Sequence, residues 1–81
     1  LRYLVPGREL ILQRRDWKYL SLLPMEGRLT GVSIRGAFYP LENAVLTADY
    51  PLGVSNEFIA DTAQLQCSGG CGLVVLTRDD A

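Results

Sequence analysis

The sequence contains no histidine, and neither sign of charge is in large excess among its 81 residues. Without histidine, the chain has no Ser-His or Cys-His nucleophile pair, no histidine metal ligand and no histidine acid–base group. Eight basic residues face nine acidic ones, for a net charge of −1, which argues against a nucleic-acid-binding surface. The longest apolar stretches, Tyr19–Met25 and Cys71–Leu76, are far too short to span a bilayer. We therefore expect neither nucleic acid nor a membrane as a partner.

The length allows one small domain with a modest core. A composition of 48% hydrophobic and 21% charged residues is typical of a globular chain. The first residue is Leu rather than Met, and we expect the chain to start within a strand. We therefore expect residues 1–81 to be a single domain of a longer protein, whose preceding part holds a share of the function.

Glycine and proline interrupt the sequence throughout, and no segment has a sustained helical period. Polar and apolar residues alternate instead in short segments about ten residues apart, which is typical of a sandwich of antiparallel strands. We predict an all-β fold, a small jelly-roll-like β-sandwich of about seven short strands. Ser68-Gly69-Gly70 is predicted to be a hairpin turn, and the last strand, apolar on both faces, to be central in its sheet. The expected strands are Glu9–Arg15, Tyr19–Leu23, Leu29–Arg35, Asn43–Ala48, Val54–Ile59, Thr62–Cys67 and Cys71–Thr77.

Cys67 and Cys71 are the first candidates for chemistry. Two thiolates without further ligands fall short of a structural zinc site, so we predict no metal site. Two reduced thiols are the expected state, with a disulfide and a metal site as the alternatives, and reduced thiols would indicate a cytoplasmic protein. The carboxylates are scattered, and Gly69-Gly70 lacks the lysine of a phosphate-binding loop. The sequence therefore offers no catalytic residue of its own.

The run Ser55-Asn56-Glu57 is polar, although it lies between Val54 and Phe58 in an apolar segment. Polar groups in such a segment are paired, exposed or used for binding. A hydroxyl and a carboxamide can read the edge of a nitrogen heterocycle, and nearby Tyr39 can hold a ring or a cation. The alternative is that Ser55 and Asn56 only satisfy the backbone of a turn.

Five stretches of the chain, in order and at matching spacing, resemble the C-terminal domain of the thiamine pyrophosphokinase (thiamine diphosphokinase) family. They are YLSLLP at Tyr19–Pro24, GVSIRG at Gly31–Gly36, YPLEN at Tyr39–Asn43, GVSNEFI at Gly53–Ile59 and GLVV at Gly72–Val75. The resemblance implies a β-sandwich that supplies much of a thiamine pocket. It also implies an enzyme that moves a pyrophosphoryl group from ATP to thiamine, giving thiamine diphosphate and AMP.

By this resemblance, Ser55 and Asn56 are expected to contact thiamine, with Glu57 and Tyr39 as weaker candidates and Arg35 as a structural or interface residue. ATP and magnesium are expected on an N-terminal nucleotide-binding domain that this sequence does not include, so the chain alone should be inactive and hold no cofactor. A cytoplasmic homodimer is expected, with the site between domains of different subunits. Two alternatives stay open: a non-catalytic β-sandwich interaction module, and a relative specific for another heterocycle such as a pterin.

Overall fold

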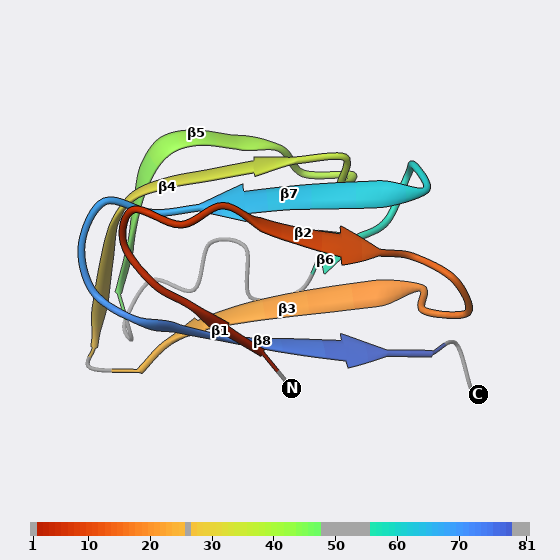
Figure 1. Ribbon diagram of the computed structural model, residues 1–81, viewed down its shortest axis with the longest axis horizontal. Helices are drawn as coiled ribbons and strands as arrows, with labels where there is room; N and C mark the ends of the chain where they lie inside the picture. The colour runs from red at the N-terminus through yellow and green to blue at the C-terminus, as the bar shows by residue number, and fades with distance from the viewer. Residues whose placement is uncertain (1, 26, 48–55, 79–81) are drawn as a thin grey trace.

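The computed structural model describes residues 2–25, 27–47 and 56–78, and its strands form two stacked sheets (Figure 1). The described residues contain no helix, and therefore none that crosses a membrane. The strands are β1 (Arg2–Leu4), β2 (Leu10–Gln13), β3 (Tyr19–Pro24), β4 (Arg28–Arg35), β5 (Leu41–Thr47), β6 (Asn56–Glu57), β7 (Thr62–Gln66) and β8 (Gly72–Thr77).

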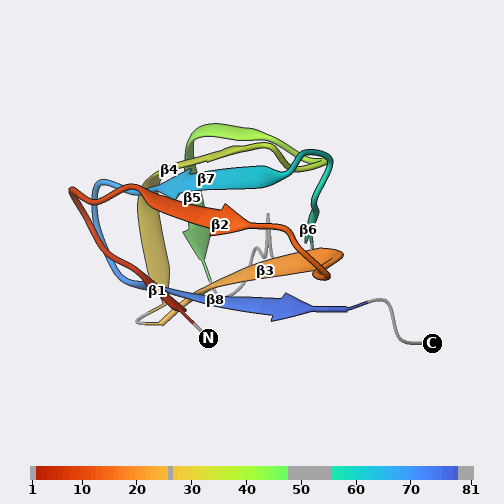
Figure 2. The same cartoon turned by 45° about the vertical axis from the view of Figure 1, so that its right-hand side comes forward.

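The strand order is that of a jelly roll. The first sheet has the order β1-β8-β3-β6 and the second β2-β7-β4-β5, and all neighbours are antiparallel. Figures 1 and 2 show the two sheets as separate layers, with successive strands passing back and forth between them. Among the described strands, β4 and β5 alone are consecutive in sequence and adjacent in one sheet. The predicted β-sandwich is thus confirmed, with eight strands because the three-residue β1 is too short to show alternation.

The core lies between the inner faces of the two sheets. Alternate residues of a strand point to opposite faces, so Leu20 and Leu22 of β3 are buried, as are Ala63 and Leu65 of β7. Each fully buried aliphatic side chain contributes about 1.5–3 kcal/mol of transfer free energy. The other buried apolar residues are Leu4, Leu12, Leu29, Val32, Ile34, Ala37, Leu46, Phe58, Cys67 and Val74.

Strand β4 departs from simple alternation. Val32 and Ile34 are buried two positions apart, as in a regular strand, but Leu29 is buried as well, three positions before Val32. The β4–β5 register shifts between these two residues, and Gly31 in between has φ +60°. A bulge of this kind inserts one residue and reverses the faces, and glycine adopts the required left-handed conformation without steric cost.

The predicted hairpin at Ser68-Gly69-Gly70 is wrong. This segment leads from β7 in the second sheet to β8 in the first. It is held against β4, because the N–H groups of Ser68 and Gly69 both donate to the carbonyl oxygen of Thr30, at 2.9 and 3.3 Å. A turn sequence does not specify which sheet the following strand joins. The prediction that the last strand is central is confirmed, since β8 lies between β1 and β3.

Candidate ligand-binding site

Most of the residues predicted to contact a ligand lie at one edge of the first sheet, where β6 is the outermost strand. Asn56 is the one buried polar residue among those the structure describes, with 2% of its surface exposed, and Glu57 beside it is half-buried. Backbone pairing with Tyr19 and Leu20 of β3 holds both residues in place. Ser55, the other principal candidate, lies outside the described residues.

The carboxamide of Asn56 is paired with the backbone of Tyr39, 17 positions earlier in the sequence. Its Oδ1 accepts the N–H of Tyr39 at 2.9 Å, and its Nδ2 donates to the carbonyl oxygen of Tyr39 at 2.8 Å. The same Oδ1 also accepts the N–H of Glu57 at 2.9 Å. The Asn56 side chain thus makes the two hydrogen bonds that the backbone of a neighbouring strand would make with Tyr39. The buried carboxamide is hydrogen-bonded, as burial of a polar group requires.

The segment around Tyr39 runs alongside β6. The N–H of Phe38 donates to the carbonyl oxygen of Glu57 at 2.7 Å, and the N–H of Ile59 donates to that of Gly36 at 3.1 Å. Ala37 and Phe58 form a bridge between these two hydrogen bonds, and both side chains are buried. Residues 36–39 therefore extend the first sheet beyond β6, and the connection from β4 to β5 becomes part of the site.

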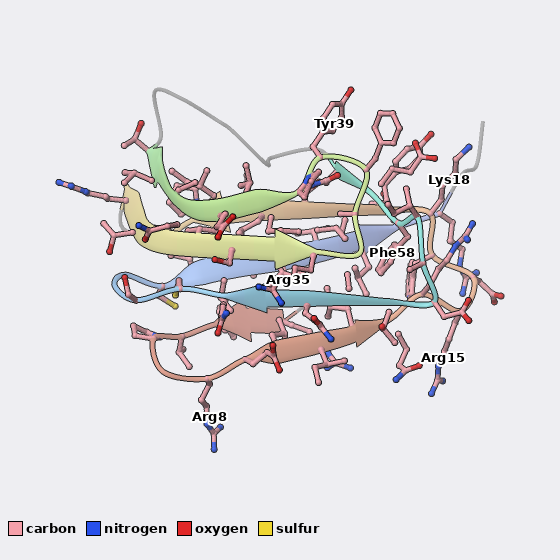
Figure 3. All side chains as sticks on the ribbon, turned by 90° about the horizontal axis from the view of Figure 1, so that it is seen from above. Arg8, Arg15, Lys18, Arg35, Tyr39 and Phe58 are labelled. Carbon is pink, nitrogen blue, oxygen red and sulfur yellow. The ribbon has the colours of Figure 1, made fainter. Side chains whose placement is uncertain are left out.

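Two aromatic rings project from this connection. Phe38 is 58% exposed and Tyr39 60%, and the rings meet edge to face with their centroids 4.9 Å apart. Figure 3 shows the Tyr39 ring pointing away from the strands, whereas Phe58 lies among them. We call Phe38 and Tyr39 the aromatic ledge. Such a pair offers a π surface to a flat ring or a cation.

A cavity of about 220 Å³ lies where the chain enters β5. Two of its lining residues carry opposite charges, Arg35 and Glu42, and Pro40 directly follows the ledge. The structure thus brings Tyr39, Asn56 and Glu57 together and places Arg35 at this cavity. Sequence reasoning missed Phe38, although its position next to Tyr39 could have indicated a paired aromatic surface.

Cys67 and Cys71 are free thiols, so the disulfide left open by the sequence is not formed. Cys67 is buried, while Cys71 is half-buried with its Sγ 4.0 Å from Sδ of Met25. Burial raises the pKa of the Cys67 thiol, and the nearby Cys71 raises it further. Within residues 2–25, 27–47 and 56–78, no three His, Cys, Asp or Glu side chains are grouped to hold a metal ion.

These two thiols should differ in reactivity. At pH about 8, iodoacetamide is expected to modify Cys71 first, because the thiolate is the reactive form and Cys67 is both buried and shifted to higher pKa. Peptide mass spectrometry against time measures both modification rates. Equal rates at the two thiols would contradict this assignment.

The raised pKa of Cys67 also predicts a pH dependence of stability. As pH rises, the Cys67 thiol loses its proton at lower pH in the unfolded chain than in the folded one, so the free energy of unfolding should fall above about pH 8.5. Urea denaturation at several pH values measures this fall, and the Cys67→Ala variant, which lacks the thiol, is the control.

Fold and site together define the class: a jelly-roll domain with a candidate site for a small ligand at the edge of its first sheet. Residues 9–76 match the profile of the thiamin pyrophosphokinase, vitamin B1 binding domain family. The match covers most of the sequence, and the chain belongs to this family. A search of the curated proteins finds no match.

Solved structures agree on the fold. Thiamine pyrophosphokinase from Bacillus subtilis superimposes with a TM-score of 0.87 at 24% identity, and that from Geobacillus thermodenitrificans with 0.86 at 22%. In both cases 98% of this chain and 37% of the other chain are covered. A thiamin pyrophosphokinase family protein from Enterococcus faecalis is 26% identical, with a TM-score of 0.79 over 98% of this chain and 36% of that one. The chain thus spans little more than a third of the length of these proteins.

Proposed function

We propose that this chain is the thiamine-binding part of a thiamine pyrophosphokinase, in which a pyrophosphoryl group passes from ATP to thiamine, giving thiamine diphosphate and AMP. The family match carries the proposal, and the aromatic ledge held beside a buried carboxamide supports it. Thiamine has a cationic thiazolium ring and a flat aminopyrimidine ring. Exposed aromatic faces attract both, and uncharged polar groups nearby do not repel the cation.

Residues of the pocket are proposed on the same grounds. Ser55, Asn56 and Tyr39 form or shape the thiamine pocket, and Glu57 borders it. The cavity of about 220 Å³, whose lining includes Pro40 directly after the ledge, is proposed to take part of the ligand. Binding at this position would orient the hydroxyl of thiamine for transfer, and positioning of this kind is a large part of catalysis in phosphoryl-transfer enzymes.

The remaining parts of the enzyme are proposed to lie outside this sequence. The described residues supply no cluster of carboxylates suited to Mg²⁺, so no step is assigned to them beyond holding thiamine. Mg²⁺ and ATP would be bound by an N-terminal nucleotide-binding domain, and the 81-residue chain alone would be inactive. A cytoplasmic homodimer, with each site between domains of different subunits, completes the proposal.

Tyr39→Ala in the full-length protein tests the ledge. We expect its thiamine Kd and thiamine KM to rise about tenfold, because a cation–π contact of about 1–2 kcal/mol is lost. The ATP KM should stay unchanged. Tyr3→Ala is the matched control, since Tyr3 is also 60% exposed but lies on β1 at the far edge of the first sheet.

Calorimetric titration with thiamine, and with a pterin as competitor, separates the alternatives. A protein that binds neither compound would support the non-catalytic interaction module instead. Binding of the pterin in preference to thiamine would indicate a relative with changed specificity. Equal losses of thiamine affinity in Tyr39→Ala and Tyr3→Ala would show that the ledge is not part of the site. That result would not contradict thiamine binding by the wild-type protein.

A further inference from the structure

We infer that Asn56 is a positioning residue, which acts on the thiamine ligand through Tyr39 by fixing the backbone that carries the aromatic ledge. The inference rests on the proposed function for its ligand, and on contacts within the chain for its mechanism. Asn56 and the Tyr39 peptide exchange two hydrogen bonds, at 2.9 and 2.8 Å, and Asn56 is 2% exposed.

The hydrogen-bonding capacity of the carboxamide is largely taken up inside the protein. Oδ1 has two lone pairs, and the N–H groups of Tyr39 and Glu57 occupy both. One of the two Nδ2 protons is bonded to the carbonyl oxygen of Tyr39. A heterocycle that donates a hydrogen bond to Oδ1 would therefore have to displace a backbone N–H group. Direct reading of the ligand edge by Oδ1 is disfavoured, and a role through Tyr39 is favoured.

The ledge needs such support because its rings have little packing of their own. Both rings are more than half exposed, so their directions are set by the backbone from which they project. The next residue, Pro40, has no N–H with which to anchor the connection. The N–H of Phe38 is bonded to Glu57 in β6, and both backbone groups of Tyr39 are bonded to Asn56. Preorganising the rings in this way lowers the cost of ordering them when a ligand binds.

The chemistry of the contact requires a carboxamide in particular. Tyr39 presents one donor and one acceptor to the same side chain, and asparagine offers both at this length. Aspartate would accept the N–H groups of Tyr39 and Glu57 but would place a negative oxygen against the Tyr39 carbonyl. Asn56→Asp is thus a nearly isosteric variant that keeps two of the three hydrogen bonds.

A double-mutant cycle on the full-length protein tests the inference, with thiamine Kd measured for wild type, Asn56→Ala, Tyr39→Ala and the double variant. We expect each single variant to weaken binding about tenfold and the double variant to be no weaker than Tyr39→Ala, because coupled residues are not additive. Losses that multiply would overturn the inference and make Asn56 a direct ligand. An unchanged Kd in Asn56→Ala would overturn it as well. If Asn56→Ala does not fold, Asn56→Asp replaces it in the cycle.

Amide hydrogen exchange of Tyr39, measured by NMR without ligand, tests the contact independently of thiamine. Exchange of the Tyr39 amide should accelerate at least about tenfold in Asn56→Ala, with the core amides of Leu22 and Val74 unchanged. In Asn56→Asp, which still accepts this N–H, the acceleration should be smaller. A Tyr39 amide that exchanges equally fast in wild type and Asn56→Ala would overturn the contact. If wild type binds no thiamine, the proposed function fails, while the exchange rates still decide whether Asn56 holds Tyr39.

Discussion

Gly36→Ala is expected to remove about 3–5 kcal/mol from the free energy of unfolding, by combining backbone strain with a steric clash. Gly36 has φ +80°, where residues with a side chain are strained. A Cβ atom there would also clash with the backbone carbonyl oxygen of Thr62, which cannot move away without disturbing β7. Because a domain of this size has about 4–12 kcal/mol of stability in total, much of the protein should unfold. Urea denaturation followed by circular dichroism measures the loss.

Gly7→Ala separates the two causes. Gly7 has the same φ of +80°, but nothing lies within 4 Å of a Cβ atom at that position. Its loss should therefore be limited to the backbone term, about 1–2 kcal/mol. Equal losses at Gly7 and Gly36 would show that the contact with Thr62 carries no cost. Since residues 36–39 also carry the aromatic ledge, thiamine binding should suffer in Gly36→Ala and not in Gly7→Ala.

Leu22→Ala is expected to cost about 2–5 kcal/mol, because it opens a cavity in the core. Leu22 is fully buried and belongs to β3, which lies between β8 and β6 in the first sheet. Its Cδ1 occupies the space above Gly72, 2.8 Å from where a Cβ atom of residue 72 would be. The two residues are therefore fitted to each other, and the backbone of β8 cannot close over the missing side chain without shifting.

Leu23→Ala is the matched control for this substitution. Leu23 is the next residue of the same strand, points to the other face and is 37% exposed. Its truncation should cost about 1 kcal/mol or less, as at surface positions. Thermal unfolding of both variants at one pH gives the comparison. Similar losses for Leu22→Ala and Leu23→Ala would mean that the sandwich buries its apolar residues less selectively than the structure indicates.

The fold class was predictable because local patterns specify it. The apolar last strand indicated a central place in its sheet, and this prediction is confirmed, since β8 lies between β1 and β3. The sheet that each strand joins was not predictable, because Ser68-Gly69-Gly70 is compatible with a hairpin and with a passage between sheets. The burial of Leu29 was not predictable for a similar reason, since the bulge at Gly31 depends on pairing with β5.

The candidate site was predictable in its residue types and not in its contacts. A polar run between apolar residues indicated that Asn56 is either paired or used, and the structure shows it paired. Its partner lies 17 positions away and contributes backbone groups, which every residue has and no sequence pattern identifies. The role of Ser55 stays a prediction, as do the contacts of Glu57 with a ligand.

The central place of β8 bears on the order in which this protein is made. A ribosome releases β1 and β3 long before Gly72–Thr77, yet these two strands meet only through β8. Until that strand emerges, the apolar faces carrying Leu4, Leu20 and Leu22 have no closed sheet, and unpaired strand edges favour aggregation. The first sheet of this domain can therefore be completed only after β8 has been synthesised, and a nascent chain interrupted before Gly72 is expected to leave these apolar faces uncovered.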